Sequence, residues 1–394
     1  MGYKKFKADC IFTGKEILGE NHVLITNENG IIENIVNETA AGDDIEIFNG
    51  ILSPGFINCH CHLELSHLKK VVENGTGLVE FLIRVIKNRN TVKEEINAAI
   101  INADAEMYGN GIVAVGDISN LTDTIPVKQK SKIRYQNFIE VLGFTEDAEA
   151  RFQNYINVYN DFCNAGFENS TSVVPHAPYT VSHSVFNLIN DFSAGKIISV
   201  HNQETLAEDE LYRTATGEFL KLYQHLNINI DFFKPYKKSS LQSYLPSLNK
   251  ATKILLVHNT CTTQEDIFFS IEQIKKSTRE IHWCLCPNAN LYIENKLPPV
   301  ELLRKNNCAV VLGTDSYASN YSLNILDEIK TLRKNFPLIE LKELLTWSTI
   351  NGAKALGIED KLGSFEKGKE PGIVCIDNIS NKNISNASAV KRIL

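Results

Sequence analysis

The sequence predicts an α/β fold, namely an eight-stranded parallel (β/α)8 barrel that carries a small β-sandwich made from both ends of the chain. Three observations lead to this prediction. Apolar strand-like runs alternate with amphipathic helix-like runs through the middle of the chain. Both ends consist of short β-like segments separated by Gly and Asn turns. The 394 residues, 43% of them hydrophobic, suffice for a barrel of typically about 250 residues and a smaller module.

The two chain ends are expected to form one β module. Short β-like segments occupy residues 8–12, 22–26, 31–35 and 45–48 near the N-terminus. The C-terminal part from Leu362 onward also consists of short β-like segments, with residues 373–376 as its clearest strand. We therefore expect the ends to pair into a composite sandwich domain of residues 1–54 and 360–394, around a barrel domain of residues 55–359.

The central region contains eight runs that we interpret as barrel strands. Most are apolar along their whole length, as strands buried on both faces must be. They occupy residues 52–59, 112–115, 133–142, 172–174, 197–200, 254–257, 281–285 and 310–312. Eight strands that are each followed by a helix favour a closed, TIM-type barrel over an open sheet.

The segments between these strands have the 3.6-residue period of helices. A capping box from Thr262 to Glu265 predicts the start of one helix. The apolar stripe of Leu78, Leu82, Val85 and Ile86 is interpreted as the core face of another. Residues 121–132 and 229–250 are interpreted as insertions, and the second is a candidate lid over the site.

Composition favours a small-molecule substrate. The net charge is −7, and no basic block is longer than residues 234–238, so a nucleic-acid-binding surface is not expected. No stretch approaches about eighteen consecutive apolar residues, and the N-terminus lacks the apolar core of a secretion signal. We therefore expect a cytoplasmic protein that does not interact with membranes.

The nine cysteines are expected to be reduced thiols, since their number is odd and they are scattered over a long chain. Two pairs, Cys59/Cys61 and Cys284/Cys286, have C-x-C spacing. This spacing is shorter than that of structural zinc sites, so we do not assign metal binding to the cysteines.

Polar residues that close the apolar strands mark the expected active site, because catalytic groups of such barrels lie at the C-terminal edge. The first strand ends in Cys59-His60-Cys61-His62, and alternation along a strand directs both histidines to the same side. Strands four, five, six and eight close with His176, His201, His258 and Asp315. A single histidine would be interpreted as structural, but the shared position of all of them favours a function.

Three histidines and one carboxylate form a suitable ligand set for one divalent ion, and we assign His60, His62, His201 and Asp315 to it. Zinc is the first expectation, although iron and manganese accept the same ligands. Water bound to zinc reaches a pKa of about 7, so that hydroxide is available as a nucleophile at neutral pH.

Proton transfer needs further groups. Glu204 lies three residues after His201 and is expected to protonate a ring nitrogen of the substrate. An ordinary carboxylate at the start of a helix is an equally weighted interpretation of Glu204. We expect His258 to hydrogen-bond the attacking hydroxide or the developing oxyanion, and Asp315 to accept the proton of the water. Glu64 and Glu80 are considered for substrate hydroxyls and are not assigned.

Seven motifs, taken together and in order, resemble the amidohydrolase superfamily. They lie at residues 54–62, 175–180, 201–205, 257–259, 286–290, 313–316 and 351–357. The likeness covers essentially the whole chain and is greatest to the mononuclear branch of aminohydrolases and chlorohydrolases, which includes adenosine, S-adenosylhomocysteine and guanine deaminases. Residues 62–66, 75–85 and 217–219 look most like aminodeoxyfutalosine deaminases.

The resemblance implies the same four metal ligands, the same roles for Glu204 and His258, and a His176 that faces the substrate. It implies a single ion, because His176 stands where binuclear members commonly carry a carboxylated lysine. It also implies the two-ended sandwich and is compatible with a homodimer. The family's usual Ala-Asp-Leu is replaced here by residues 370–372, Glu-Pro-Gly, which we interpret as a change in a surface strand.

The leading hypothesis is a metal-dependent hydrolytic deaminase that acts on an amino-substituted heterocycle, most simply a purine or purine nucleoside derivative. A second hypothesis keeps the metal and changes the leaving group, giving hydrolysis of a cyclic amide or of a chlorinated ring. A third is an inactive metal-binding relative, which the intact set of Glu204, His258 and Asp315 argues against, because a binding role needs no proton transfer.

Overall fold

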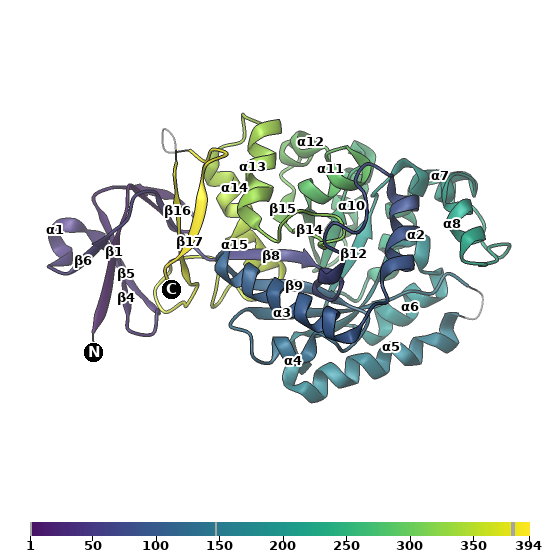
Figure 1. Ribbon diagram of the computed structural model, residues 1–394. Coiled ribbons are helices and arrows are strands. Elements are labelled where there is room, and N and C mark those ends of the chain that lie inside the picture. Colours follow the sequence, from purple (N-terminus) through teal and green to yellow (C-terminus); the bar gives the residue numbers. More distant parts are fainter. Residues whose placement is uncertain (1, 146–147, 380–382) are drawn as a thin grey trace.

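The computed structural model describes residues 2–145, 148–379 and 383–394. Its central region contains eight parallel strands in two four-stranded sheets (Figure 1). The first sheet has the order β11-β10-β9-β8, and the second has the order β12-β13-β14-β15. The strands are β8 (Phe56–Cys61), β9 (Ile112–Ser119), β10 (Arg134–Val141), β11 (Thr171–Pro175), β12 (Ile197–Asn202), β13 (Lys253–His258), β14 (Glu280–Leu285) and β15 (Ala309–Leu312).

The edges of the two sheets meet on both sides. On one side, the backbone N–H of His201 donates to the carbonyl of His176 over 2.9 Å. On the other, Cys61 and Asp315 form an isolated parallel bridge, and Thr314 N–H donates to the carbonyl of His60. Within the described residues the ladders form these two sheets and not one continuous closed sheet. Parallel α/β architecture is thus established, as the sequence predicts.

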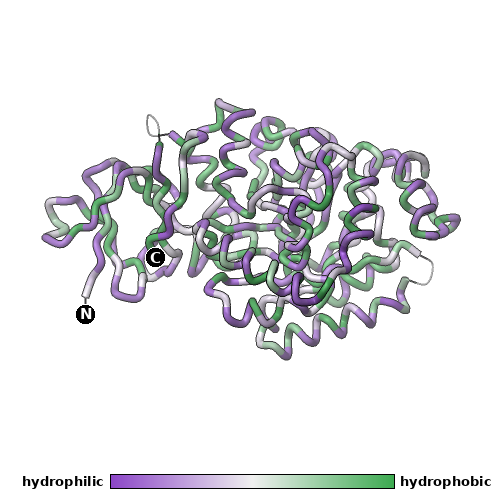
Figure 2. Tube along the Cα trace, in the orientation of Figure 1, coloured by the Kyte–Doolittle hydropathy of each residue, from purple (hydrophilic) through white to green (hydrophobic). Residues whose placement is uncertain are grey.

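Helices surround the strands, and both hydrophobic and hydrophilic stretches occur along them (Figures 1 and 2). The helices of this region are α2 (Leu78–Asn88), α3 (Lys93–Gly109), α4 (Ile125–Lys128), α5 (Ala148–Phe162), α6 (His183–Phe192), α7 (Leu206–Thr214), α8 (Phe219–His225), α9 (Ser240–Tyr244), α10 (Gln264–Lys275), α11 (Pro287–Glu294), α12 (Val300–Lys305), α13 (Ile325–Asn335), α14 (Leu341–Ser348) and α15 (Ile350–Ala355). No helix of the described residues is long and apolar enough to cross a bilayer.

The capping box before α10 lies one residue later than predicted. Thr263 accepts a hydrogen bond from the backbone N–H of Asp266, and the side chain of Asp266 accepts one from the N–H of Thr263. The hydroxyl of Thr262 donates instead to Gln203 Oε1 over 2.7 Å. The prediction of residues 262–265 was wrong because two overlapping sequence matches satisfy the same motif.

The terminal β module contains two sheets, with orders β5-β4-β1-β6 and β17-β16-β7-β2-β3. Its strands are β1 (Tyr3–Lys7), β2 (Cys10–Phe12), β3 (Ile17–Gly19), β4 (His22–Asn27), β5 (Ile32–Asn37), β6 (Ile45–Ile47), β7 (Ile51–Pro54), β16 (Ile373–Asp377) and β17 (Ala389–Arg392), with the short helix α1 (Glu38–Ala41). The C-terminal β16 pairs antiparallel with the N-terminal β7. Both chain ends therefore contribute to one sheet.

The predicted first barrel strand, residues 52–59, is two strands. At Gly55 the chain leaves the terminal module as β7 and enters the barrel region as β8. A Cβ at Gly55 would lie 2.2 Å from Val113 Cγ1, so only glycine fits this close approach. The N–H of Gly55 donates to the carbonyl of the buried Pro371. The segment 370–372 therefore lies where the module meets the barrel and not in a surface strand.

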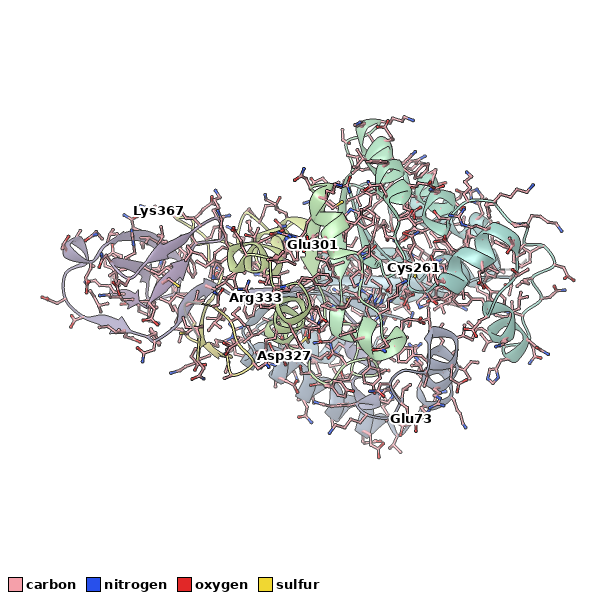
Figure 3. The ribbon with its side chains drawn as sticks, turned by 90° about the horizontal axis from the view of Figure 1, so that it is seen from above. Glu73, Cys261, Glu301, Asp327, Arg333 and Lys367 are labelled. Carbon is pink, nitrogen blue, oxygen red and sulfur yellow. The ribbon has the colours of Figure 1, made fainter. Side chains whose placement is uncertain are left out.

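The carboxyl ends of the barrel strands point away from the terminal module. In Figure 3, Cys261, three residues beyond the end of β13, lies on the side of the molecule remote from Lys367 of the module. The site that these strand ends form is consequently built from the barrel region alone.

Candidate metal centre

Strand β8 brings two imidazoles to the C-terminal edge of the parallel strands, which we call the rim. His60 and His62 are buried, with 0% and 7% of their surface exposed. The intervening Cys59 and Cys61 are also buried, and burial raises the pKa of both thiols well above the usual range. Thiolates are therefore disfavoured at these positions. All nine cysteines are free, as predicted.

Strands β12 and β15 deliver the remaining predicted ligands. His201 lies in β12, and its Nδ1–H donates to the carbonyl of His176 over 2.8 Å, which leaves Nε2 free to bind a cation. Asp315 follows β15 after Gly313, where a Cβ would lie 2.8 Å from the Cβ of His60. Asp315 itself has φ of 59°. Such left-handed backbone in a non-glycine residue is typical of a functional site.

The four predicted ligand atoms converge. His62 Nε2 lies 3.1 Å from His60 Nε2 and 3.3 Å from His201 Nε2. Asp315 Oδ1 lies 3.5 Å from His60 Nε2 and 3.3 Å from His62 Nε2. Four donors bonded at about 2.1 Å in a tetrahedron lie about 3.4 Å apart. The donor set therefore fits a divalent ion.

The charges of this cluster agree with a cation site. Burial lowers the pKa of His60, His62 and His201, so that the imidazoles are neutral ligands. Burial alone would raise the pKa of Asp315, but the hydrogen bond with His60 and the neighbouring His62 lower it overall. The Oδ2 atom of Asp315 accepts a hydrogen bond from Ser319 over 2.5 Å, which orients the carboxylate.

His258 lies at the end of β13 with φ of 75°. Its Nδ1–H faces Asn290 Oδ1 at 3.1 Å, and its Nε2 lies 3.5 Å from Glu204 Oε2. It also belongs to a group with His60, His201 and Asp315 whose potential ligand atoms lie within 4.8 Å of one another. His258 is thus close enough to the centre to hydrogen-bond a reacting group there.

Glu204 is buried beside this centre. Its Oε1 accepts a hydrogen bond from the hydroxyl of Tyr179 over 2.6 Å. Burial raises the pKa of Glu204 to about 8, so this carboxyl retains a proton near neutral pH. Tyr179 is itself fixed, because its ring stacks on Phe219 with centroids 4.2 Å apart. Glu204 lies two residues before α7 (Leu206–Thr214), at the helix start that the alternative interpretation describes, and it also lines the cavity.

A cavity of about 140 Å³ opens onto the centre, and its lining includes His62, His201, His258, Asp315 and Glu204. His176 also lines it, and its Nδ1 lies 2.6 Å from Thr180 Oγ1. The stripe on α2 that sequence analysis assigned to the helix core lies here. Leu78, Leu82, Val85 and Ile86 form part of the apolar cavity wall, and Ile86 is 45% exposed.

Sequence reasoning missed three polar residues of this cavity, namely Arg89, Asn120 and Glu140. Glu140 closes β10 (Arg134–Val141), the third barrel strand. The strand-end rule that found His176 and His201 would have found Glu140 if applied to that strand. Arg89 follows α2 and Asn120 follows β9, in loops where no sequence pattern marks them.

A buried ion pair supports the segment after His62. Asp117 Oδ1 accepts a hydrogen bond from the N–H of Leu63 over 2.8 Å, and Asp117 Oδ2 lies 2.6 Å from Lys128 Nζ. Both charged side chains are fully buried. Lys128 belongs to α4 inside the predicted insertion 121–132, so this insertion contacts Asp117 of β9, which holds the segment after His62.

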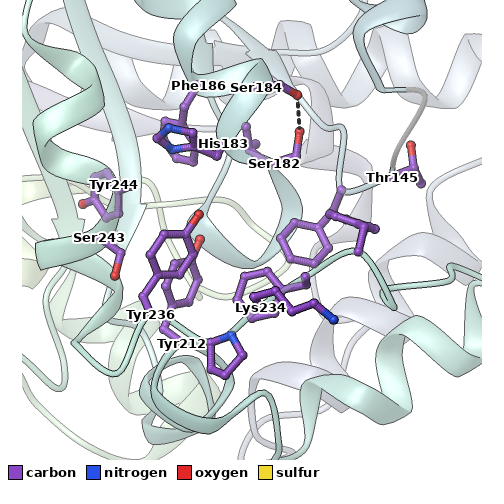
Figure 4. A pocket seen from close by; sticks show the side chains of 15 residues that line it. Thr145, Ser182, His183, Ser184, Phe186, Tyr212, Lys234, Tyr236, Ser243 and Tyr244 are labelled. Atoms are coloured by element: carbon purple, nitrogen blue, oxygen red, sulfur yellow. Dashed lines mark hydrogen bonds between the residues drawn. The ribbon is translucent and has the colours of Figure 1, made fainter.

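The second insertion, residues 229–250, contributes no lining residue to the cavity at the centre. Its residues 232–236 line a separate cavity of about 440 Å³ together with Phe144 and Tyr212 (Figure 4). Seven of the fifteen described residues that line this cavity are Phe or Tyr, and Lys234 also lines it. The lid assigned to this insertion stays a prediction.

The family model described as "Amidohydrolase family" matches residues 51–392. The chain is 30% identical over 330 residues to an adenosine deaminase of Helicobacter pylori, an alignment that covers 82% of this chain and 77% of that protein. It is 27% identical over 359 residues to an aminodeoxyfutalosine deaminase of a Nitratiruptor species, covering 88% and 84%. The fold resembles the crystal structure of Helicobacter pylori aminofutalosine deaminase in complex with methylthio-coformycin, with a TM-score of 0.80, 24% identity, and coverage of 97% and 93%.

Proposed function

Because the chain belongs to the amidohydrolase family, a group of C–N bond hydrolases, we propose that it deaminates an adenine nucleoside with water, releasing ammonia. The observation that carries this proposal is the convergence of three imidazoles and one carboxylate in a cavity that also contains Glu204. Metal-dependent hydrolytic deamination needs an activated water, a proton donor at the ring and a site that binds the heterocycle, and the cavity contains side chains for each.

We assign the ion to His60, His62, His201 and Asp315. Zinc is the proposed metal, because three neutral imidazoles and a carboxylate are its usual ligands in hydrolases. A zinc ion held by these residues would supply an activated water for attack on the amino-bearing ring carbon. His176, on the neighbouring strand end, is proposed to contact the heterocycle.

The proton steps are assigned to the chain's own residues. Asp315 takes the proton of the attacking water, and His258 Nε2 hydrogen-bonds the oxygen that becomes the product carbonyl. Glu204, which burial keeps protonated near neutral pH, donates from its carboxyl to the ring nitrogen beside the reacting carbon. Asp315 passes the water proton to the amino group, the C–N bond breaks and ammonia leaves. The remaining hydroxyl proton returns to Glu204, and the ring keeps the oxygen of the water as its carbonyl.

The apolar residues that line the cavity at the metal centre indicate which class of substrate fits there. Leu78, Leu82, Leu226 and Ile293 line the cavity, and they suit a nucleoside whose 5′ position carries an apolar group. The named relatives include 5′-deoxyadenosine, aminodeoxyfutalosine and 5-methylthioadenosine/S-adenosylhomocysteine deaminases. We propose a substrate of this kind and not a nucleotide with a 5′-phosphate.

The architecture is proposed to follow the same family. The two four-stranded sheets then correspond to halves of one TIM-type barrel, residues 55–359, and the terminal sheets to a sandwich of residues 1–54 and 360–394. Buried residues of both terminal sheets, among them Phe6, Leu24, Ile11 and Ile373, share one hydrophobic cluster, which supports the sandwich. The nine free thiols support a cytoplasmic location.

The test is ammonia release by the zinc-loaded protein from adenosine, 5′-deoxyadenosine, methylthioadenosine, aminodeoxyfutalosine and guanine, with a cyclic amide and a chlorinated triazine alongside. We expect ammonia from at least one adenine nucleoside. Turnover of only the cyclic amide or the triazine would replace deamination by the second hypothesis, and no turnover of any compound would favour an inactive relative.

Glu204→Gln tests the assigned roles. Removing the proton donor is expected to lower kcat by roughly 10²- to 10⁴-fold and to leave the zinc content, measured by elemental analysis, unchanged. Glu210→Gln, an exposed change in the neighbouring helix, is the matched control and should keep full activity. Loss of zinc in Glu204→Gln would mean that Glu204 is a ligand.

A further inference from the structure

Glu140 is a buried acid with one unpartnered oxygen at the cavity. It lies at the end of β10 and is 3% exposed. Its Oε2 accepts a hydrogen bond from Asn120 Nδ2 over 3.1 Å. Its Oε1 has no hydrogen-bond partner. The nearby nitrogen His201 Nδ1, 3.7 Å away, already donates to the carbonyl of His176. An unsatisfied buried oxygen beside a binding cavity indicates a missing partner.

The surroundings hold Glu140 in place. Asn120 Nδ2 also donates to the backbone carbonyl of Glu140 over 3.0 Å, and Asn120 Oδ1 accepts from Arg89 Nη2 over 2.8 Å. Arg89 is in turn paired with the buried Glu64. This chain of contacts fixes the carboxyl of Glu140 and leaves only Oε1 for a ligand.

The two acids considered from the sequence for substrate hydroxyls are already occupied. Glu64 Oε2 accepts from the backbone N–H groups of Asn120 and Leu121, and Glu64 Oε1 is taken by Arg89. Glu80 lies outside the cavity lining, is 49% exposed at its side chain and pairs with Arg84 over 2.7 Å. Among these three acids, Glu140 alone lines the cavity with a free oxygen.

The strand order places Glu140 relative to the reaction. Strands β10, β11 and β12 are consecutive, and Glu140, His176 and Glu204 follow one another at or just beyond their ends. Potential ligand atoms of Glu140, His176 and His201 lie within 4.8 Å of one another. A nucleoside whose reacting carbon lies between the metal ligands and Glu204 shares this cavity with His176 and Glu140, which also line it.

We propose that Glu140 is a specificity-determining residue that recognises a hydroxyl group on the sugar of the nucleoside. This inference rests on the proposed function. A hydroxyl both donates and accepts hydrogen bonds, so it satisfies Oε1 whether the carboxyl of Glu140 is ionised or protonated. An ammonium group or a second carboxylate would satisfy only one of these two states.

The experiment combines variants with substrate analogues. The zinc-loaded wild type, Glu140→Met and Glu80→Met are assayed with 5′-deoxyadenosine and with its 2′,5′- and 3′,5′-dideoxy analogues. In the wild type, loss of the recognised hydroxyl is expected to lower kcat/KM by roughly 10- to 100-fold. In Glu140→Met that ratio should fall to within about threefold of one, whereas Glu80→Met should keep the wild-type ratio.

The outcomes separate the two proposals. If the wild type deaminates no adenine nucleoside, the proposed function fails whatever Glu140 does. If the wild type deaminates all three compounds equally, if Glu140→Met keeps the full ratio, or if Glu80→Met abolishes it, the assignment to Glu140 is overturned and the function stands. Should Glu140→Met not fold, Glu140→Leu decides, because a full ratio kept in that variant, which cannot hydrogen-bond a hydroxyl, also overturns it.

Discussion

The rim of the barrel and the core of the terminal module differ in what they bury. The module core consists of apolar side chains, among them Phe6, Ile11 and Leu24, all at 1% exposure or less. The rim buries His60, His201, Glu140, Glu204 and Asp315 at 5% or less. Burying ionisable groups opposes folding unless partners or a ligand compensate. The difference agrees with a module that stabilises the chain and with the cation site that we propose at the rim.

The substitution Asp315→Asn tests most directly whether the buried groups of the rim hold a cation. If the rim exists to hold a cation, losing its only predicted anionic ligand should abolish zinc binding. It should also lower kcat/KM by on the order of 10³-fold or more, since the metal contributes several kcal/mol to the transition state. Zinc content by elemental analysis and ammonia release measure both effects.

The control for that variant is Asp327→Asn on α13, where the carboxylate pairs with Lys330 on the protein surface. It should retain zinc and activity. Full zinc occupancy in Asp315→Asn would show that His60, His62 and His201 suffice, with His258 as the further ligand that its position allows.

The strand ends were predictable because their chemistry is local in sequence. His60, His62, His201, His258 and Asp315 each close an apolar run, and parallel strands bring such ends to one edge. The division at Gly55 was missed although Pro54-Gly55 is a turn signal in the sequence, because the apolar residues on both sides of it were joined into one strand, residues 52–59.

The partners of buried charged side chains could not be predicted from the sequence, because tertiary packing decides them. The pairing of Lys128 with Asp117, and of Arg89 with Glu64, joins positions 11 and 25 residues apart through tertiary packing. Periodicity assigned the stripe of α2 to the helix core because it identifies an apolar face without identifying what that face contacts. In this protein the face contacts the cavity.

A second prediction tests whether the core of the terminal module contributes to stability and not to activity. Leu24→Ala removes a fully buried side chain from the shared cluster of the terminal sheets. It should lower the free energy of unfolding by about 2–5 kcal/mol and leave kcat and zinc content unchanged, because the site draws no residue from the module. Urea unfolding of the zinc-loaded protein measures the first effect. A large fall in kcat at a temperature where the variant remains folded would mean that the module supports the site directly.

The smallest expected effect concerns the pH dependence of the free energy of unfolding. We expect this dependence to come from the buried ionisable groups of the barrel region and not from the terminal module. Burial raises the pKa of Glu140, Glu204, Glu208 and Glu328 to about 8. In each case the stability contribution is fully present below the unfolded pKa, near 4.5, and is lost as pH rises toward 8. The described residues of the terminal module bury no carboxyl.

The rim histidines change the free energy of unfolding with pH in the opposite direction from the carboxyls. Burial lowers the pKa of His60, His62, His201 and His258. Their contribution is present above the unfolded value, near 6.5, and is lost as pH falls through the folded pKa. The metal-free protein should therefore be most stable between about pH 4.5 and 6.5, with an acid limb due to the histidines and an alkaline limb due to the carboxyls.

Glu328→Gln tests the alkaline limb without touching the metal ligands. If Glu328 is protonated in the fold, the variant should flatten that limb by at most about 1.4 kcal/mol per pH unit and leave the acid limb as it is. Urea unfolding of the metal-free protein from about pH 3.5 to 8.5 measures both limbs, with the exposed Glu370→Gln of the module as control. Glu328 also accepts hydrogen bonds from Asn288 and Asn320, which favour its ionised form. An alkaline limb of unchanged slope together with a uniform loss of stability would show that these bonds outweigh burial at this carboxyl.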